Sequence, residues 1–373
     1  MTEPAYERLQ PLLGGVADEV REARAVLGFD GTVDVICHPV EARHGPGGDY
    51  EAFGSMAAFG ERVVAADGKS AIVELVEQQR KIGGNGPIMS GALASAGLSV
   101  DYIGTLGEGS PDPAYEEFAS RIGVHCLAPP AVTHALEFPN GKLMLTKLAS
   151  YQAMDAATLA ERIGVADMKE MLEPARLVGL LNWSCLPGFA SMLEWLLAEF
   201  LPASPAHPER VVFFDLADPS MRSGDDLKVV LEAIAKFSSH GRVVLGMNLN
   251  EAQQVAKVLG MEPPGNEPAS LAAALERIRE ALEIDLAVGH ATSFAACAGD
   301  GISETVSGPY TATPRITTGA GDHFNAGFCL GLVGGLSPAD ALTLGVVYSG
   351  YYVRHARAPR FDELADFLQS IDS

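Results

Sequence analysis

The chain has 373 residues, 47% of them apolar, which is enough for a large buried core in one big α/β domain or in two smaller ones. It carries 26 basic and 48 acidic residues and a formal net charge of −22 at pH 7. This charge repels nucleic acid and anionic membrane surfaces at long range, so we expect neither as a partner. Any anion bound by the chain therefore needs local donors, and we expect backbone amides and a metal ion rather than a broad basic surface.

Cysteine usage and the first residues both indicate a cytoplasmic protein. The five cysteines contain no C-x-x-C pair, and an odd number at irregular spacing fits reduced thiols better than a disulfide framework. Residues 1–24 are charged and amphipathic and lack the apolar core of a signal peptide. No run is long enough to span a bilayer.

Short apolar runs alternate with helical patterns along the chain. The runs predict buried strands at residues 25–29 (AVLGF), 101–105 (DYIGT), 177–181 (LVGLL), 211–216 (VVFFDL), 243–247 (VVLGM) and 286–288. Helices are predicted at residues 86–96, 190–201, 225–239, 251–260 and 321–335, and Ser337 is predicted to cap another. Because the strands are apolar throughout, they should be buried on both faces of a mainly parallel sheet in an α/β fold.

Two carboxylates follow the first strand. Residues 28–36 read GFDGTVDVI and contain Asp30 and Asp34. A carboxylate accepts two hydroxyl hydrogen bonds and so suits a polyol, although turns also recruit Asp as a cap.

Two segments fit the strand–helix pattern poorly, and we interpret them as a lid rather than as a separate domain. They cover about residues 37–81 and 124–151. The second segment contains Lys142 and Lys147, which are either solvated or close to an acidic acceptor. Between the segments, residues 81–98 begin KIGGNG, and Gly83 and Gly84 indicate backbone left open for a ligand to approach.

A short motif, NLNE, follows the strand VVLGM. It contains Asn248 and Glu251, and an amide and a carboxylate at the end of a strand can orient the hydration shell of Mg²⁺. The alternative is that Asn248 or Asn250 only caps the next helix.

The strongest motif is TTGAGDHFNAGF at residues 317–328. Small residues at Gly319, Ala320 and Gly321 precede a helix-compatible run, and the free amides of a helix start form an anion site. Asp322, beside that site, could accept a proton from a substrate hydroxyl. From spacing alone, a Gly-rich turn with Asp322 as an ordinary cap carries about equal weight.

This motif closely resembles the C-terminal signature of the ribokinase-like (PfkB-type) carbohydrate kinases. The resemblance extends over about residues 25–365 and implies a three-layer α/β/α domain with a small β lid. It implies that Asp322 is the catalytic base and that Gly319, Ala320 and Gly321 form the anion hole, with Thr318 on the nucleotide side.

Other motifs resemble further elements of the same family. NLNE resembles its N-x-x-E element, so Asn248 and Glu251 are expected to organise Mg²⁺ and the phosphates, largely through water. KIGGNG resembles the region that borders the acceptor, which implies substrate contacts for Gly83, Gly84 and Asn85. The carboxylate that binds two sugar hydroxyls in the family is matched best by Asp34, with Asp30 as a second candidate.

Three departures from the family pattern affect the interpretation. Ile316 stands where an Asp usually precedes the motif, so activation by a monovalent cation is expected to be weak or absent. VGHATSF replaces the usual T-x-G near the nucleotide, which leaves His290 as a candidate lining residue. FDLADPSMR (residues 214–222) resembles the adenosine-kinase-like version of a D-x-N-x-R segment.

The chain has no P-loop signature, no protein-kinase motif set and no Rossmann fingerprint. We therefore expect one kinase domain over residues 1–373 that uses ATP and Mg²⁺ to phosphorylate an alcohol group of a sugar or sugar derivative. A nucleoside acceptor, an ADP donor and a catalytically silent, ligand-sensing member of the fold are the alternatives. The lid is a candidate surface for a homodimer.

Overall fold

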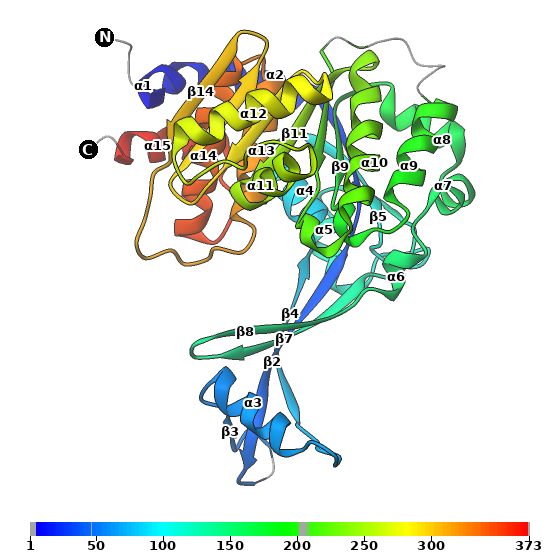
Figure 1. Cartoon of the computed structure of the whole chain (residues 1–373), viewed down its shortest axis with the longest axis vertical. Coiled ribbons are helices and arrows are strands. Elements are labelled where there is room, and N and C mark those ends of the chain that lie inside the picture. The colour runs from blue at the N-terminus through cyan, green and yellow to red at the C-terminus, as the bar shows by residue number, and fades with distance from the viewer. Residues whose placement is uncertain (1–4, 46, 201–206, 208, 372–373) are drawn as a thin grey trace.

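The computed structural model describes residues 5–45, 47–200, 207 and 209–371, and its body is built on one nine-stranded sheet (Figure 1). Pairing is parallel from β12 to β6 and antiparallel between β12, β13 and β14. All six predicted strands are confirmed. In spatial order the strands are β14 (Ile302–Ser307), β13 (Phe294–Gly299), β12 (Leu286–His290), β11 (Arg242–Asn248), β10 (Val211–Asp215), β9 (Ala175–Leu181), β1 (Arg24–Phe29), β5 (Ser99–Gly104) and β6 (Gly123–Cys126).

Helices cover both faces of this sheet, which confirms the predicted α/β/α layers. Successive residues of one strand enter different cores: Phe213 packs on one side of β10, and Val212 and Phe214 on the other. This two-sided burial is why the strands are apolar throughout. The first face carries α2 (Leu13–Glu22), α4 (Asn85–Ser95), α13 (Ala320–Val333), α14 (Pro338–His355) and α15 (Phe361–Ile371). The second carries α7 (Ala156–Arg162), α8 (Gly164–Leu172), α9 (Phe189–Trp195), α10 (Gly224–Ala235), α11 (Leu249–Val258) and α12 (Pro268–Leu282).

The predicted helices are confirmed, with small changes at their ends. The helix expected over residues 190–201 is α9 followed by a π-helical turn, Leu196–Phe200, and residue 201 lies outside the described residues. Ser337 caps α14 as expected, because its side chain accepts the Asp340 N–H at 3.2 Å. Within the described residues, no helix combines the length and apolar character needed to cross a membrane.

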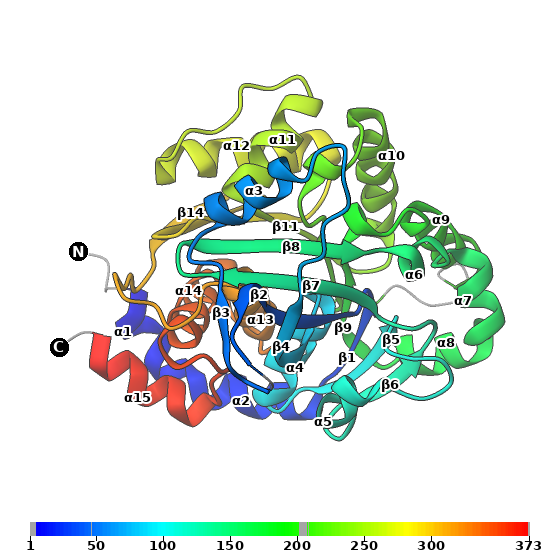
Figure 2. The same cartoon turned by 90° about the horizontal axis from the view of Figure 1, so that it is seen from below.

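The lid is a second, five-stranded sheet that projects from the body (Figures 1 and 2). Its extent differs from the prediction in two ways. The lid sheet begins at Thr32, so Asp34 lies inside its first strand, and residues 124–126 belong to β6 of the main sheet. The lid contains β2 (Thr32–Arg43), β3 (Tyr50–Ala52), α3 (Met56–Ala65), β4 (Leu75–Gly83), β7 (Ala131–Phe138) and β8 (Gly141–Lys147).

Three buried tyrosines fix the point where the chain passes from body to lid. The Tyr102 hydroxyl donates to the Asp30 carbonyl at 2.6 Å, and the Tyr115 hydroxyl donates to the Thr32 carbonyl at 2.9 Å. The Tyr151 hydroxyl lies 2.7 Å from Thr32 Oγ1. Gly31 sits between them, and a side-chain carbon there would come within 2.2 Å of the Thr105 carbonyl oxygen, so only glycine fits.

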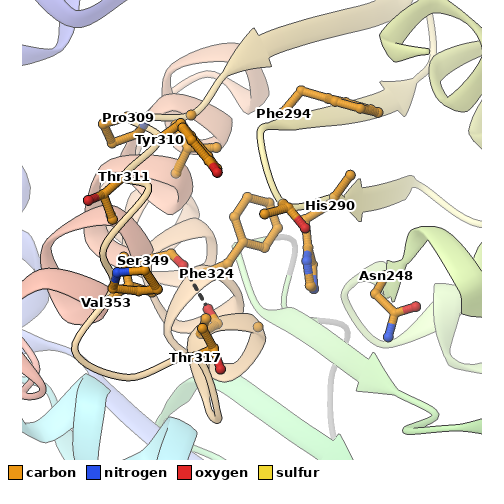
Figure 3. Close-up of a pocket in the computed structure, with 18 of the residues that line it drawn as sticks. Asn248, His290, Phe294, Pro309, Tyr310, Thr311, Thr317, Phe324, Ser349 and Val353 are labelled. Carbon is orange, nitrogen blue, oxygen red and sulfur yellow. Dashed lines mark hydrogen bonds between the residues drawn. The ribbon is translucent and has the colours of Figure 1, made fainter. Parts of the chain in front are cut away.

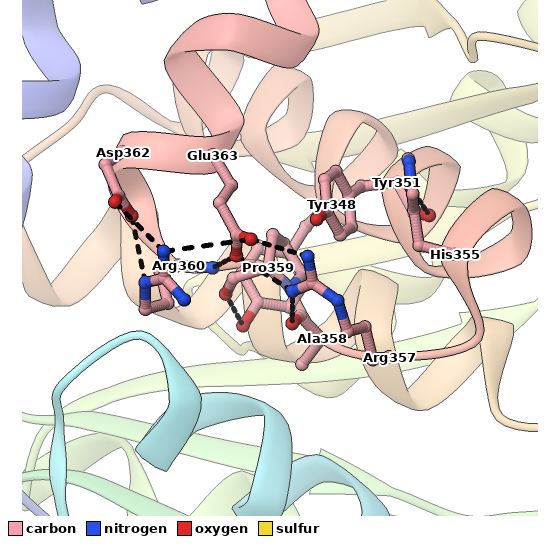
Figure 4. A network of polar contacts seen from close by, with 9 residues as sticks. All are labelled: Tyr348, Tyr351, His355, Arg357, Ala358, Pro359, Arg360, Asp362 and Glu363. Atoms are coloured by element: carbon pink, nitrogen blue, oxygen red, sulfur yellow. Dashed lines mark hydrogen bonds and ion pairs between the residues drawn. The ribbon is translucent and has the colours of Figure 1, made fainter.

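The end of α14 is joined to α15 by an ion-pair network (Figure 4). Arg357 donates two hydrogen bonds to Glu363, at 2.9 and 2.5 Å, and the Arg360 amide donates a third at 3.0 Å. The Arg357 guanidinium lowers the pKa of Glu363 to about 2. In the same connection, the Tyr348 hydroxyl donates to the Pro359 carbonyl at 3.1 Å. These contacts join α14 and the connection after it to α15.

Candidate active site

The turn before α13 has the conformation that its sequence requires. Gly319 has φ +87° and ψ 1°, and the Ala320 N–H donates to the Thr317 carbonyl at 3.1 Å. Because Thr318 does not have a positive φ, these features define a type II turn rather than a type I′ turn, and the third residue of a type II turn needs the positive φ that glycine readily adopts. α13 then starts at Ala320, and Asp322 lies in its first turn. The predicted anion site and carboxylate are thus adjacent in the structure.

Asp322 lies in a negatively charged environment. Loss of hydration in the cleft raises the pKa of its carboxyl well above the usual range. Repulsion from Asp215, Asp30 and Glu251, in that order, raises it further. A carboxyl so poised gains a proton more readily than an exposed Asp, as a general base requires.

Asp215 is a site residue that the sequence analysis did not identify. It ends β10, at the carboxyl edge of the parallel sheet where α/β proteins bind ligands. Its Oδ1 accepts the Ala217 N–H at 2.7 Å and its Oδ2 accepts Asn325 Nδ2–H at 2.8 Å. Burial, followed by repulsion from Asp30, raises the pKa of Asp215 to about 6. The segment FDLADPSMR could have indicated this residue. Only the fold shows that Asp215, the first Asp of the segment, is close enough to Asp322 to raise its pKa.

Asn248 and Glu251 form a reciprocal cap at the start of α11. Asn248 Oδ1 accepts the Glu251 N–H at 3.0 Å, while Glu251 accepts the Asn248 N–H at 2.8 Å and Nδ2–H at 2.6 Å. Burial raises the pKa of Glu251 well above its usual range, and Asp215 adds to the rise. The capping interpretation is therefore correct. Glu251 also belongs to a carboxylate cluster, which consists of Asp322 and the three carboxylates that repel it, Asp215, Asp30 and Glu251.

A cavity of about 490 Å³ opens beside the type II turn (Figure 3). His290 ends β12 and points into this cavity between Asn248 and Phe324 (Figure 3). It also faces the turn, since a side-chain carbon on Gly321 would lie 3.1 Å from His290 Cε1. Burial lowers the pKa of His290 to about 4. Of the two threonines in the motif, Thr317 lines the cavity, whereas the Thr318 carbonyl accepts a hydrogen bond from Tyr352 at 2.8 Å.

The remaining cavity walls are largely apolar. They come from the β12–β13 connection, the segment after β14, and α14. The lining side chains include Phe294, Pro309, Tyr310, Pro314, Val346 and Val353.

The paired glycines Gly83 and Gly84 make room for the two carboxylates. A side-chain carbon on Gly83 would come within 2.8 Å of Asp34 Oδ2. One on Gly84, which has φ +96°, would come within 2.4 Å of Asp30 Oδ2. The space that the two glycines leave open is occupied by these carboxylates, and the contacts of Gly83 and Gly84 with a ligand stay a prediction.

Asp34 lies on the lid sheet between two other polar residues. Lys81 of β4 and Thr133 of β7 are its partners in the strand register. Loss of hydration raises the pKa of Asp34, and the Lys81 and Lys142 ammonium groups counteract that rise. Lys142 itself pairs with Glu137 at 3.0 Å, and Lys147 is exposed.

Asp30 is completely buried and already holds protein donors on both oxygens. Oδ1 accepts the Gly86 N–H at 3.0 Å, and Oδ2 accepts Asn182 Nδ2–H at 2.8 Å. It therefore fixes the start of α4, where Asn85 is the first residue. Asn182 has φ 64° and follows β9, and neither its position nor its contact could be read from local sequence.

Comparisons with known proteins show what the chain as a whole is similar to. A family model described as prokaryotic ketohexokinase matches residues 8–371. A curated protein, a ketohexokinase of Haloferax volcanii, is 31% identical over 353 residues, which are 94% of this chain and 92% of that protein.

Solved structures share the fold at low sequence identity. A ribokinase of Thermotoga maritima has a TM-score of 0.63 at 14% identity and covers 93% of this chain and 99% of its own. A ribokinase of Cryptococcus neoformans in complex with ADP has a TM-score of 0.65 at 17% identity, with 92% and 99% covered. A nucleoside kinase of Methanocaldococcus jannaschii has a TM-score of 0.61 at 13% identity, with 94% and 99% covered.

Proposed function

The chain belongs to the prokaryotic ketohexokinase family, and we propose on that premise that its acceptor is a ketohexose. The family and the ribokinase fold establish the reaction class, which is ATP-dependent phosphorylation of a sugar. The observation that carries the proposal for the site is the position of Asp322. It stands in the first turn of α13, directly after a type II turn that we assign as the anion site.

We assign Asp322 as the general base that removes the proton from the attacking sugar hydroxyl. The amides of Gly319 and Gly321 would then stabilise negative charge on the transferring phosphoryl group, while the Ala320 N–H between them closes the turn on the Thr317 carbonyl. The turn before α13 and the residues assigned to the acceptor both lie next to α4. A side-chain carbon on Gly319 would lie 3.3 Å from Ile88 Cγ2 of α4, and the first turn of that helix is tied to Asp30.

Side chains of the lid root are assigned to the acceptor. Asp34 would accept two sugar hydroxyl bonds, with Gly83, Gly84 and Asn85 bordering the sugar. Asp30 is assigned a positioning role, because its two oxygens already accept bonds from Gly86 and Asn182. His290 and Thr318 remain assigned to the nucleotide side, His290 through the cavity and Thr318 through the turn.

The carboxylate cluster fits a hard cation held through water. Both oxygens of Glu251 are engaged by Asn248, which leaves outer lone pairs to orient water rather than a full set of direct ligands. Within the described residues, no group of three or more His, Cys, Asp or Glu side chains is arranged to hold a metal directly. When bound, Mg²⁺ supplies positive charge at the phosphates. We propose Asn248 and Glu251 as the residues that orient its hydration shell.

We extend the proposal to assembly and location. The lid exposes apolar side chains, among them Val63, Val64 and Ile72 at 54%, 74% and 90%, and we assign this surface to a homodimer. Light scattering coupled to size exclusion tests the dimer, and Ile72→Asp should shift it toward the monomer. We place the enzyme in the cytoplasm, which cell fractionation can check.

A matched acceptor panel tests the function. Purified protein with ATP and Mg²⁺ would be offered ketohexoses, the corresponding aldohexoses and nucleosides, and each reaction repeated with ADP. We expect the highest kcat/KM with a ketohexose and ATP. A nucleoside or an aldohexose as best acceptor would overturn the ketohexose assignment. Tight sugar binding without turnover of any acceptor would instead identify the chain as a ligand-sensing member of the fold.

A further inference from the structure

Three consecutive carbonyls where the turn enters α13 each accept a hydrogen bond from a side chain. They belong to Thr318, Gly319 and Ala320. The Tyr352 hydroxyl donates to the Thr318 carbonyl at 2.8 Å, and His323 Nδ1–H donates to the Gly319 carbonyl at 2.8 Å. The Ser349 hydroxyl donates to the Ala320 carbonyl at 2.9 Å, a bond drawn dashed in Figure 3. All three donors come from α13 and α14.

These bonds bear on the amides because the two polar groups of a trans peptide point in opposite directions. The peptide between Thr318 and Gly319 is the central unit of the type II turn. A type I turn differs from a type II turn by a flip of that central unit. Since Tyr352 holds its carbonyl, the Gly319 N–H is directed to the other side of the turn. Without the hydroxyl, one of the bonds that oppose the flip is lost.

His323 and Tyr352 form one packed unit. Their rings stack with centroids 3.5 Å apart and an interplanar angle of 14°. A carbonyl oxygen can only accept, so the His323 Nδ1 that faces Gly319 must carry the hydrogen. Burial lowers the pKa of His323 to about 4, and burial followed by repulsion from Asp322 raises the pKa of Tyr352 to about 12. Both donors therefore keep the same protonation state throughout the physiological range.

We propose that His323 and Tyr352 are positioning residues for phosphoryl transfer, which hold the type II turn so that its amides stay directed at the transferring group. The inference rests on the proposed function of residues 319–321 as the anion hole. Neither side chain is assigned a contact with sugar or nucleotide. Their effect should thus fall on the transition state, where charge on the phosphoryl oxygens has to be met by donors already in place.

The chain offers a matched control on the same helix. Tyr348 is also fully buried and stacks on His323, at 6.2 Å, but its hydroxyl donates to the Ala92 and Pro359 carbonyls instead of the turn. Tyr348→Phe removes a buried hydroxyl without releasing any carbonyl of the turn. Tyr352→Phe also removes one hydroxyl, but this hydroxyl is the tether, the donor that holds the Thr318 carbonyl of the turn.

The paired variants at His323 separate its two roles. His323→Phe keeps a ring for stacking but removes the donor. His323→Asn removes the ring and keeps a side-chain N–H at nearly the same distance from the backbone as Nδ1. If the hydrogen bond positions the turn, Asn should be closer to wild type than Phe.

Steady-state kinetics with the best sugar and ATP, together with calorimetry, make the test. Losing one oxyanion donor costs about 10²–10³ in kcat, so a loosened donor should cost less, roughly tenfold for Tyr352→Phe and for His323→Phe. The KM for sugar should stay within about twofold, because ground-state sugar contacts are untouched. ATP binding should weaken several-fold while adenosine binding stays unchanged, since only ATP carries the phosphates. Tyr348→Phe should keep wild-type kcat even if its melting temperature falls.

The outcomes distinguish this inference from the function on which it rests. Wild-type turnover in Asp322→Asn would reject the proposed site itself. Loss of activity in Asp322→Asn with wild-type kcat in both Tyr352→Phe and His323→Phe would reject only the tether. An equal loss of kcat in Tyr348→Phe, or His323→Asn as poor as His323→Phe, would also reject it, because general loosening of the packing between α13 and α14 would then explain the effect.

Discussion

The two sides of the cleft are built from different parts of the polypeptide. On the proposed nucleotide side, the element that we assign to the phosphates is backbone, a type II turn whose carbonyls accept hydrogen bonds from Tyr352, His323 and Ser349. On the acceptor side, the polar groups are side chains at the root of the lid, with Asp34 set against Gly83. Donors supplied by backbone amides move only if the turn itself changes conformation. A polar group supplied by a side chain is replaced by a single substitution. We infer that the backbone of this architecture sets the reaction type and that side chains at the root of the lid set the choice of acceptor.

The largest expected effect is on the nucleotide side, where Asp322→Asn removes the base and leaves the turn in place. Turnover should fall by roughly 10²–10⁴-fold, the usual contribution of a positioned general base. ATP affinity should change little, because the amides of residues 319–321 remain. Steady-state kinetics and calorimetry on the same preparation measure both quantities. Turnover within a few-fold of wild type would remove Asp322 from the mechanism.

On the acceptor side, Asp34→Ala should weaken sugar use while sparing the nucleotide. A charged hydrogen bond is worth roughly 1.5–3 kcal/mol, so kcat/KM for the sugar should fall at least about tenfold. Lys142→Ala and Lys147→Ala are the matched lid controls and should stay within a few-fold, since one lysine pairs with Glu137 and the other is exposed. A lysine variant more damaged than Asp34→Ala would indicate an anionic acceptor and overturn the neutral sugar.

Between the two sides, Glu251→Gln tests whether the cap of α11 also orders the metal shell. Gln keeps the shape of the side chain, but its amide group cannot accept both bonds that Asn248 donates. The Mg²⁺ concentration for half activity should rise about tenfold, the lower end of what loss of an outer-shell group costs. The sugar KM should hardly move. Glu262→Gln, on an exposed residue beyond α11, is the control, and an unchanged Mg²⁺ titration in Glu251→Gln would leave Glu251 as a cap alone.

The sequence predicted the body of the molecule well because its signals there are local. Continuous apolar strands reflect burial on both faces, as the opposite cores of Phe213 and Phe214 show. The turn at Gly319 was legible because positive φ restricts the residue type. Asp322, Asn248 and Glu251 could be proposed as site residues from local sequence, because each belongs to a short motif that starts a helix.

The remaining site residues depend on contacts between distant segments. Asp215 acquires its environment from Asn325, 110 residues away, and Asn182 lies 152 residues from its partner Asp30. The roles of Gly83 and Gly84 were incompletely predicted because the carboxylates that fill their space lie elsewhere in the chain, on β2 and on the connection before it. The start of the lid was placed too late, since the first residues of β2 are mostly buried like those of a body strand although β2 pairs only within the lid sheet.

The smallest expected effect concerns stability rather than rate, and it follows from the charge that the cleft concentrates. The pKa values of Asp322, Asp215, Glu251 and Asp30 are all raised in the folded protein. A carboxyl whose pKa is raised on folding binds more protons in the native state, so the free energy of unfolding falls as pH rises through the interval between the two values. For Asp215 that interval runs from the ordinary value of 3.8 to about 6. At neutral pH the ionised cluster therefore destabilises the fold, and Asp322→Asn should raise the melting temperature by about 1–3 °C while turnover falls. Thermal unfolding between pH 5 and pH 8 should show a larger gain in melting temperature at the alkaline end.

Asp300→Asn, at the exposed turn between β13 and β14, is the control and should show no gain in melting temperature. A lower melting temperature for Asp322→Asn at pH 8 would mean that its carboxylate stabilises the fold, and the repulsive cluster would then be the wrong account of this side of the cleft.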